Sequence, residues 1–170
     1  GNLRTLKKFE KIFYYKNIIT SPYKKNNKII SSTFIRKKIR EGKIELVNKL
    51  LNRQWCVEGR VVKGKKRGRK IGFPTCNMRL DSYVIPKLGV YAVKVNGNNF
   101  NKSGIANIGY RPTFNGQSLL LETNIFGINK ILYNKVIKIS FKKFLRPEKK
   151  FKNFEHLKKQ IKNDIKRAKN

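Results

Sequence analysis

Apolar and polar positions alternate with a period of two through the middle of the chain. In residues 55–62, Trp55, Val57 and Val61 alternate with more polar positions, and the same pattern recurs over residues 137–142. A period of two places alternate side chains on opposite faces of a strand. Shorter apolar runs at 89–95, 103–108 and 119–126 are separated by clusters of Gly, Pro and Asn. These features predict an antiparallel sheet or a small barrel.

Apolar residues recur every three or four positions near both ends of the chain, which indicates helices. Residues 32–51 predict two short helices, because Ser32 or Thr33 suits an N-cap and Gly42 suits a left-handed stop. Residues 154–168 predict one amphipathic helix with a Lys-rich outer face. The short pair fits ordinary packing, and in a basic protein it also fits a helix-turn-helix.

The charge balance is strongly basic, with 42 Lys and Arg against 9 Asp and Glu and a formal net charge of +33. This charge favours either a nucleic-acid-binding module or a solvated basic surface with incidental polyanion binding. We expect a soluble, cytoplasmic protein without a membrane partner, because no apolar run reaches the length of a signal peptide or a membrane span. Cys56, Cys76 and His156 are too few for a four-ligand zinc site, so we expect reduced thiols.

The segment VVKGKKRGRKIGFPTCN, residues 61–77, interleaves three glycines with Lys and Arg. Backbone amides and cations of this kind bind phosphates. The segment lacks the Gly-Lys-Ser/Thr ending of a Walker A loop and the pattern of a dinucleotide fingerprint. Thr75 and Asn77 stand two residues apart and supply oxygen donors that suit Mg²⁺. The same pair also fits a turn-stabilising role.

A single carboxylate, Glu122, lies within the apolar run LLLETN. Burying a carboxylate costs several kcal/mol unless it is paired. Glu122 is therefore either a functional acid or an outward-facing strand residue paired with a lysine.

Five motifs, IGFPTCN, GVYAVKV, ANIGYRPTF, LLLETNIF and FLRPEKKF, occur in an order and spacing that resemble the riboflavin kinase family over about residues 55–168. The resemblance implies a mainly β fold, a six-stranded antiparallel Greek-key barrel with a C-terminal helix, over residues 54–170. Upstream, IISSTFIRKKIREGKIELVNKLLNR resembles the end of the FMN adenylyltransferase module of bacterial bifunctional FAD synthetases. Residues 1–53 are therefore expected to be a short helical remnant of that module.

The resemblance also implies roles for individual residues. The loop 63–73 would cover ATP, and Glu122 would accept the proton of the attacking alcohol. The Mg²⁺ ligands would be Thr75 and Asn77, and the ATP contacts Gly64, Arg69 and Thr75. Flavin contacts would come from Tyr133, Arg146, Lys149 and Phe151, where cations and aromatic rings suit a flat ligand.

The expected function is a Mg-ATP-dependent riboflavin kinase that converts riboflavin to FMN. Two residues depart from the family pattern: Cys76 replaces the usual Ala, and Asn124 stands where His is frequent, which would alter flavin affinity or product release. The paired histidines of the adenylyltransferase signature are missing from this sequence, so FMN adenylylation by this chain alone is not expected. The alternatives are a bifunctional fragment that is inactive without its missing module, and a basic nucleic-acid-binding module.

Overall fold

The computed structural model describes residues 2–25, 28–64, 66–113 and 116–170, and the chain divides into two compact units at Ser31/Ser32. The first unit holds helix α1 (Leu3–Phe13) and a hairpin of β1 (Lys24–Lys25) and β2 (Lys28–Ile29). Asn2 caps α1, because its side-chain oxygen accepts a hydrogen bond of 2.9 Å from the amide of Thr5.

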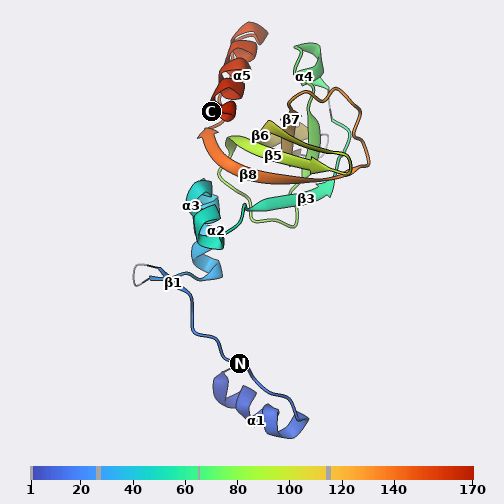
Figure 1. Ribbon diagram of the computed structural model, residues 1–170. Coiled ribbons are helices and arrows are strands. Elements are labelled where there is room, and N and C mark those ends of the chain that lie inside the picture. Colours follow the sequence, from blue (N-terminus) through green and yellow to red (C-terminus); the bar gives the residue numbers. More distant parts are fainter. Residues whose placement is uncertain (1, 26–27, 65, 114–115) are drawn as a thin grey trace. The chain divides into compact units, whose positions relative to one another are not determined.

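The second unit is built around a six-stranded antiparallel sheet (Figure 1). Its strands are β3 (Cys56–Arg60), β4 (Cys76–Arg79), β5 (Gly89–Gly97), β6 (Phe100–Thr113), β7 (Gly116–Ile125) and β8 (Val136–Arg146), in the order β3-β8-β5-β6-β7-β4. β5, β6 and β7 are successive neighbours and β4 lies beside β7, which is a Greek-key arrangement. A bridge between Val62 and Asn77 brings the two edges together. The predicted barrel is confirmed.

Alternate side chains of the strands form the core of the barrel. The fully buried set includes Val57, Met78, Tyr91, Val93, Ile108, Leu121, Ile139 and Phe141. The ring of Phe141 lies 4.8 Å from that of Trp55 and 5.2 Å from that of Tyr91, between ring centroids. Burying one such side chain stabilises the fold by about 1.5–3 kcal/mol. The alternating pattern therefore identifies the residues whose side chains fill the interior of the barrel.

A second apolar layer lies outside the barrel, under helix α5 (Phe154–Lys169). Ile161, Ile165 and Ala168 of this helix pack against a cluster of strand residues. That cluster consists of Val90, Ala92, Ile105 and Leu145. The predicted C-terminal helix is confirmed, and its apolar stripe covers the outer face of β5, β6 and β8.

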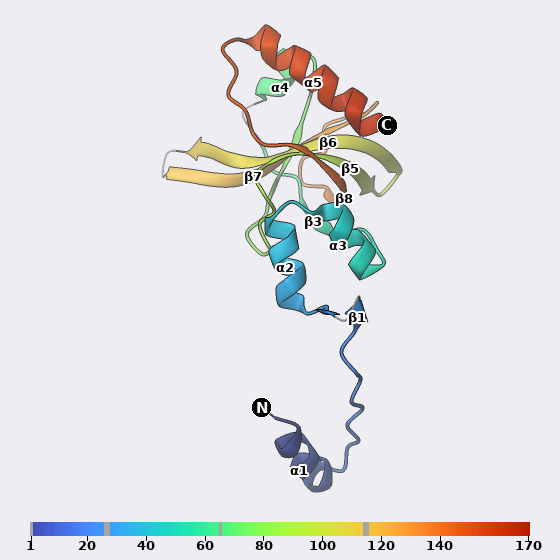
Figure 2. The same cartoon turned by 90° about the vertical axis from the view of Figure 1, so that its left-hand side faces the viewer.

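The predicted helix pair is present as α2 (Ser32–Arg40) and α3 (Ile44–Leu51), joined at Gly42 with φ of 76°. Asn48 ties α3 to the barrel, since its side chain donates to the carbonyl of Phe141 (2.9 Å) and accepts from the amide of Trp55 (2.8 Å). In both views α2 and α3 lie on the opposite side of the barrel from α5 and from α4 (Arg67–Lys70) (Figures 1 and 2).

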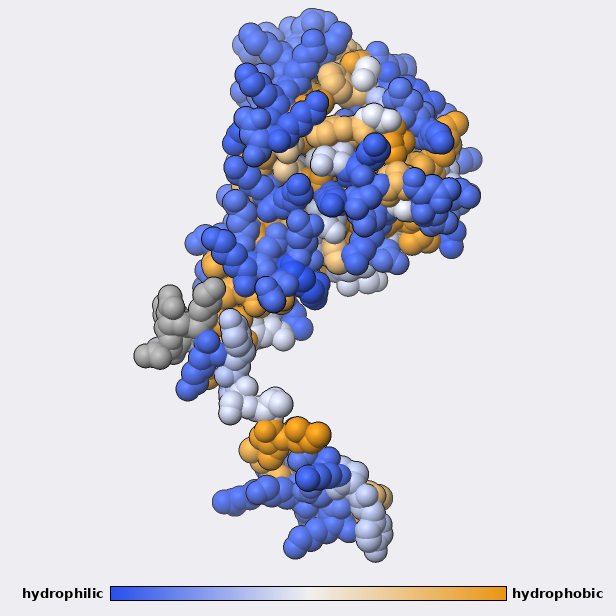
Figure 3. Space-filling view, in the orientation of Figure 1, coloured by the Kyte–Doolittle hydropathy of each residue, from blue (hydrophilic) through white to orange (hydrophobic). Residues whose placement is uncertain are grey.

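These contacts place α2 and α3 in the same compact unit as the barrel, which begins at Ser32. The assignment of residues 1–53 to an adenylyltransferase module stays a prediction. Hydrophilic side chains cover most of the face of this unit that Figure 3 shows, with apolar side chains between them. Among the helices that the structure describes, none has both the length and the apolar character needed to cross a bilayer.

Candidate active site

Three polar residues stand side by side on neighbouring strands. Asn77 of β4 lies directly opposite Glu122 of β7, which in turn lies opposite Asn107 of β6. Directly opposite residues of antiparallel strands project from the same face. The neighbours of Glu122, Leu121 and Thr123, are fully buried, so this row projects from the outer face of the barrel. We call Asn77, Glu122 and Asn107 the polar row.

The basic glycine loop, residues 63–73 with α4, lies against one end of this row; Lys65 falls outside the described residues. A Cβ atom on Gly64 would stand only 2.0 Å from the side-chain nitrogen of Asn77. A Cβ on Gly68 would stand 2.4 Å from the carbonyl oxygen of Phe73. Both glycines therefore serve close packing, and the loop contacts the polar row because Gly64 has no side chain.

Two amide oxygens of the polar row are buried without a hydrogen-bond partner in the described part of the chain. They are Oδ1 of Asn77, a residue that is only 5% exposed, and Oδ1 of Asn107. A buried acceptor without a donor costs about 1–3 kcal/mol, which a ligand would relieve. Amide and hydroxyl oxygens are donors that Mg²⁺ accepts. Asn77, with the exposed Thr75 two residues before it, thus fits a Mg²⁺ site.

An arginine holds the carboxylate of the polar row. Arg111 donates to Oε2 of Glu122 from Nη2 (2.9 Å) and Nε (3.2 Å), and from Nη1 to Oε1 of Glu148 (3.1 Å). Asn107 donates to the same Glu148 oxygen at 3.0 Å. Burial opposes the charge of Arg111, but the two carboxylates outweigh it and raise the pKa of its guanidinium. Glu122 thus faces outwards, as the alternative to a buried functional acid expected, but its partner is an arginine and not a lysine.

Sequence reasoning assigned no role to Arg111, Glu148 or Asn107. A signal was present, because Asn107, Gly109 and Arg111 are two residues apart along one strand and so share a face. Gly109 lets Glu148 approach, since a Cβ there would lie 2.1 Å from the Glu148 carboxylate.

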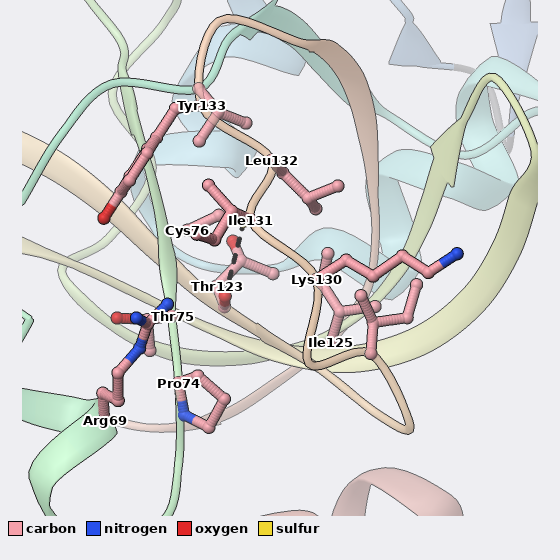
Figure 4. A pocket seen from close by; sticks show the side chains of 12 residues that line it. Arg69, Pro74, Thr75, Cys76, Thr123, Ile125, Lys130, Ile131, Leu132 and Tyr133 are labelled. Atoms are coloured by element: carbon pink, nitrogen blue, oxygen red, sulfur yellow. Dashed lines mark hydrogen bonds between the residues drawn. The ribbon is translucent and has the colours of Figure 1, made fainter.

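A small pocket of about 40 Å³ brings together other predicted residues. Arg69, Thr75, Cys76, Thr123 and Tyr133 are among those that line it. Figure 4 shows the Tyr133 ring extending towards Arg69 and Thr75, whereas Lys130 extends away from them. Tyr133, expected at the flavin, therefore shares a pocket with two residues expected at ATP. Burial raises the pKa of the Cys76 thiol to about 11.

Arg146 and Phe151 also come together, with the guanidinium of Arg146 5.8 Å from the centre of the Phe151 ring. Arg146 makes three hydrogen bonds of 2.8–3.0 Å to the carboxylate of Asp164 on α5, which is 1% exposed. Lys149 is exposed to solvent. Asn124 donates to the carbonyl oxygen of Pro74 at 2.7 Å, so it holds the segment that leads into Thr75.

Comparison with known proteins identifies the family and the fold of the chain. Residues 51–170 match the family described as flavokinase, or riboflavin kinase. The chain belongs to the riboflavin kinase family. The motif resemblance is thereby confirmed, and the matched residues include the whole barrel and α5.

Two curated relatives and one solved structure extend the comparison. The bifunctional riboflavin kinase/FMN adenylyltransferase of Bacillus subtilis is 44% identical over 148 residues, which are 84% of this chain and 46% of that protein. The protein of the same description from Buchnera aphidicola subsp. Schizaphis graminum is 42% identical, over 97% of this chain and 54% of its own. A crystal structure described as a macrolide-efflux protein from Streptococcus pneumoniae has a TM-score of 0.84 at 33% identity, covering 96% of this chain and 54% of that chain.

The riboflavin kinase domain thus lies in a chain that spans about half the length of the curated relatives it matches. The structural similarity to the Streptococcus pneumoniae protein shows that the two chains share a fold.

Proposed function

We propose that this domain transfers the terminal phosphoryl group of Mg-ATP to the 5′-hydroxyl of riboflavin and so produces FMN. The register of β4 and β7 supports this function most directly, because it sets a buried, unpartnered amide oxygen, Asn77 Oδ1, directly opposite the Glu122 carboxylate. The family supplies the substrates of the proposal. The geometry supports it with an amide oxygen that would hold the cation and a carboxylate that would accept the proton, on one face of the barrel.

The nucleotide half of the site would be the glycine loop and the start of β4. Thr75 and Asn77 would hold Mg²⁺, which when bound neutralises charge on the phosphates. Gly64 would let the loop close against Asn77, and Arg69 would contact phosphate oxygens. Tyr133 lines the same pocket as Arg69 and Thr75, which favours a contact with the nucleotide over the flavin contact that the motifs imply.

Glu122 would orient the 5′-hydroxyl and accept its proton as the phosphoryl group is transferred. Its side chain is 32% exposed, so a substrate hydroxyl has access to it. The flavin half would be the connection between β8 and α5, where Arg146 and Phe151 already lie together and Lys149 is exposed. Catalysis in such a site comes mainly from positioning and electrostatic stabilisation.

The test is the conversion of riboflavin to FMN by the purified chain with ATP and Mg²⁺, followed by chromatography. The variant Glu122→Gln keeps the shape of the side chain and removes the base, so we expect FMN formation to fall by about 100- to 10,000-fold. Glu58→Gln, at an exposed position of β3, is the matched control and should keep wild-type turnover. Near-wild-type turnover by folded Glu122→Gln would remove Glu122 as the proton acceptor.

The bifunctional relatives suggest a larger context for this domain. We propose that residues 1–53 belong to an adenylyltransferase module of which the chain holds a part, because the alignment with the Buchnera relative extends over 97% of the chain. We also propose that the enzyme works in the cytoplasm, where its substrate ATP is available. Assaying FAD alongside FMN in the same reaction tests whether this chain adenylylates FMN on its own, which we do not expect.

A further inference from the structure

We propose that Arg111 is a positioning residue for phosphoryl transfer, which fixes the Glu122 carboxylate and ties it to the connection that would bind the flavin. This inference rests on the proposed function. Arg111 lies on β6, Glu122 on β7 and Glu148 between β8 and α5, so one guanidinium joins three parts of the site.

The hydrogen bonds of Arg111 hold one oxygen of Glu122 and leave the other available. Nε and Nη2 both donate to Oε2, and the hydrogen bonds found in the described part of the chain leave Oε1 without a donor. Two donors from one rigid guanidinium fix the position of the oxygen that accepts them both. Oε1 is therefore the atom that would accept the hydrogen of the substrate hydroxyl.

The second carboxylate fixes Arg111 itself. Glu148 Oε1 accepts from Nη1 of Arg111 and from the side-chain nitrogen of Asn107. Gly109 lies between these two strand residues and gives Glu148 room to pack against β6. Glu148 is two residues from Arg146 and three from Phe151. Arg111 thus links the proton acceptor to the segment proposed to hold the other substrate.

Charge alone would act in the opposite direction. A cation beside a carboxylate favours its ionised form, which makes the carboxylate a weaker proton acceptor. If Arg111 acted through its charge only, removing it would leave the proton transfer unchanged or faster. If it acts by holding the carboxylate in place, removing it slows the reaction, because a displacement of 1 Å costs about 100-fold in rate. The sign of the rate change separates the two explanations.

The experiment compares FMN formation by wild type, Arg111→Gln, Arg111→Lys and the control Arg60→Gln. Arg60 is a strand arginine on β3 that donates to the carbonyl of Asn134. We expect kcat to fall about 100-fold in Arg111→Gln with little change in either KM, because the base is displaced while the substrates still bind. Arg111→Lys can still donate a hydrogen bond to the carboxylate but lacks the fork, so it should recover about tenfold of this loss. Arg60→Gln should match wild type.

A further variant tests whether an unneutralised Glu148 causes the loss. The double variant Arg111→Gln/Glu148→Gln removes the second carboxylate, and we expect kcat to stay low. Recovery of kcat in the double variant, a wild-type or faster kcat in Arg111→Gln, or a loss confined to KM would each overturn the inference. Thermal unfolding checks that each variant folds. If Arg111→Gln does not fold, kcat is compared between wild type and Arg111→Lys instead. A wild-type protein that makes no FMN would refute the proposed function instead.

Discussion

Replacing Gly64 by alanine tests the contact between the glycine loop and the polar row. The added Cβ would lie 2.0 Å from the side-chain nitrogen of Asn77 and 2.8 Å from its Cγ. Ordinary contacts between such atoms begin near 3.4 Å, so the amide or the loop must shift by about 1 Å. A shift of that size at a reacting centre costs about 100-fold in rate. We therefore expect Gly64→Ala to lower kcat/KM for Mg-ATP by about that factor.

The assay measures FMN formation while ATP and Mg²⁺ are varied separately. If Asn77 is displaced, Gly64→Ala needs more Mg²⁺ than wild type to reach half of its own maximal rate. Gly72→Ala is the control in the same loop, since a Cβ there meets nothing within 4 Å although φ is 86°. It introduces backbone strain of roughly 1–2 kcal/mol without a clash. Wild-type kcat/KM in Gly64→Ala at every Mg²⁺ concentration would refute the assignment of Asn77.

Two further predictions concern buried groups. Asp164→Ala leaves the Arg146 guanidinium, whose side chain is 16% exposed, without its carboxylate, so the free energy of unfolding in urea should fall by about 3–5 kcal/mol. A loss as small as that in Glu41→Ala, which removes a carboxylate that is 30% exposed from Lys38 and Lys43, would contradict this. The pKa of the Cys76 thiol is raised by burial from 9.0 to about 11, so the unfolded chain loses this proton at lower pH than the folded chain. The corresponding stability is present below about pH 9 and is lost as pH rises through about 11. The loss on raising the pH should be roughly 3 kcal/mol larger in wild type than in Cys76→Ala; equal losses would contradict it.

The fold could be predicted from the sequence because the strands and helices carry regular apolar patterns. The alternation that begins at Trp55 identified β3, and the stripe through Ile161 and Ile165 identified α5. In the first unit, α1, β1 and β2 were not predicted as separate elements. In the barrel unit two elements were missed, α4 and β4, which have only four residues each. Such short segments contain too few positions to show a period. Strand β6 extends beyond the predicted 103–108 because polar positions on either side of that run, such as Asn101 and Arg111, interrupt the apolar pattern.

Of the site, the sequence predicted only the residues that the family resemblance implies. The register that sets Asn77 opposite Glu122 depends on the pairing of β4 with β7, two strands separated by two others in the sequence. Patterns within one segment give no information about pairing between distant segments. For the same reason the Arg111–Glu148 and Arg146–Asp164 pairs were not foreseen. Tyr133 was grouped with the flavin residues by the family resemblance, and only the folded chain shows that it lines one pocket with Arg69.

The acidic residues are more informative about the site than the far more numerous cations. Only 9 Asp and Glu occur among 170 residues, and three of them, Glu122, Glu148 and Asp164, contact arginines at or beside the proposed site. A surface lysine added to a chain of net charge +33 changes its field little, whereas each carboxylate locally reverses it. In this domain the carboxylates fix the arginines in place. The net charge of +33 is therefore weaker evidence for a nucleic-acid partner than the match over residues 51–170 is for a riboflavin kinase domain.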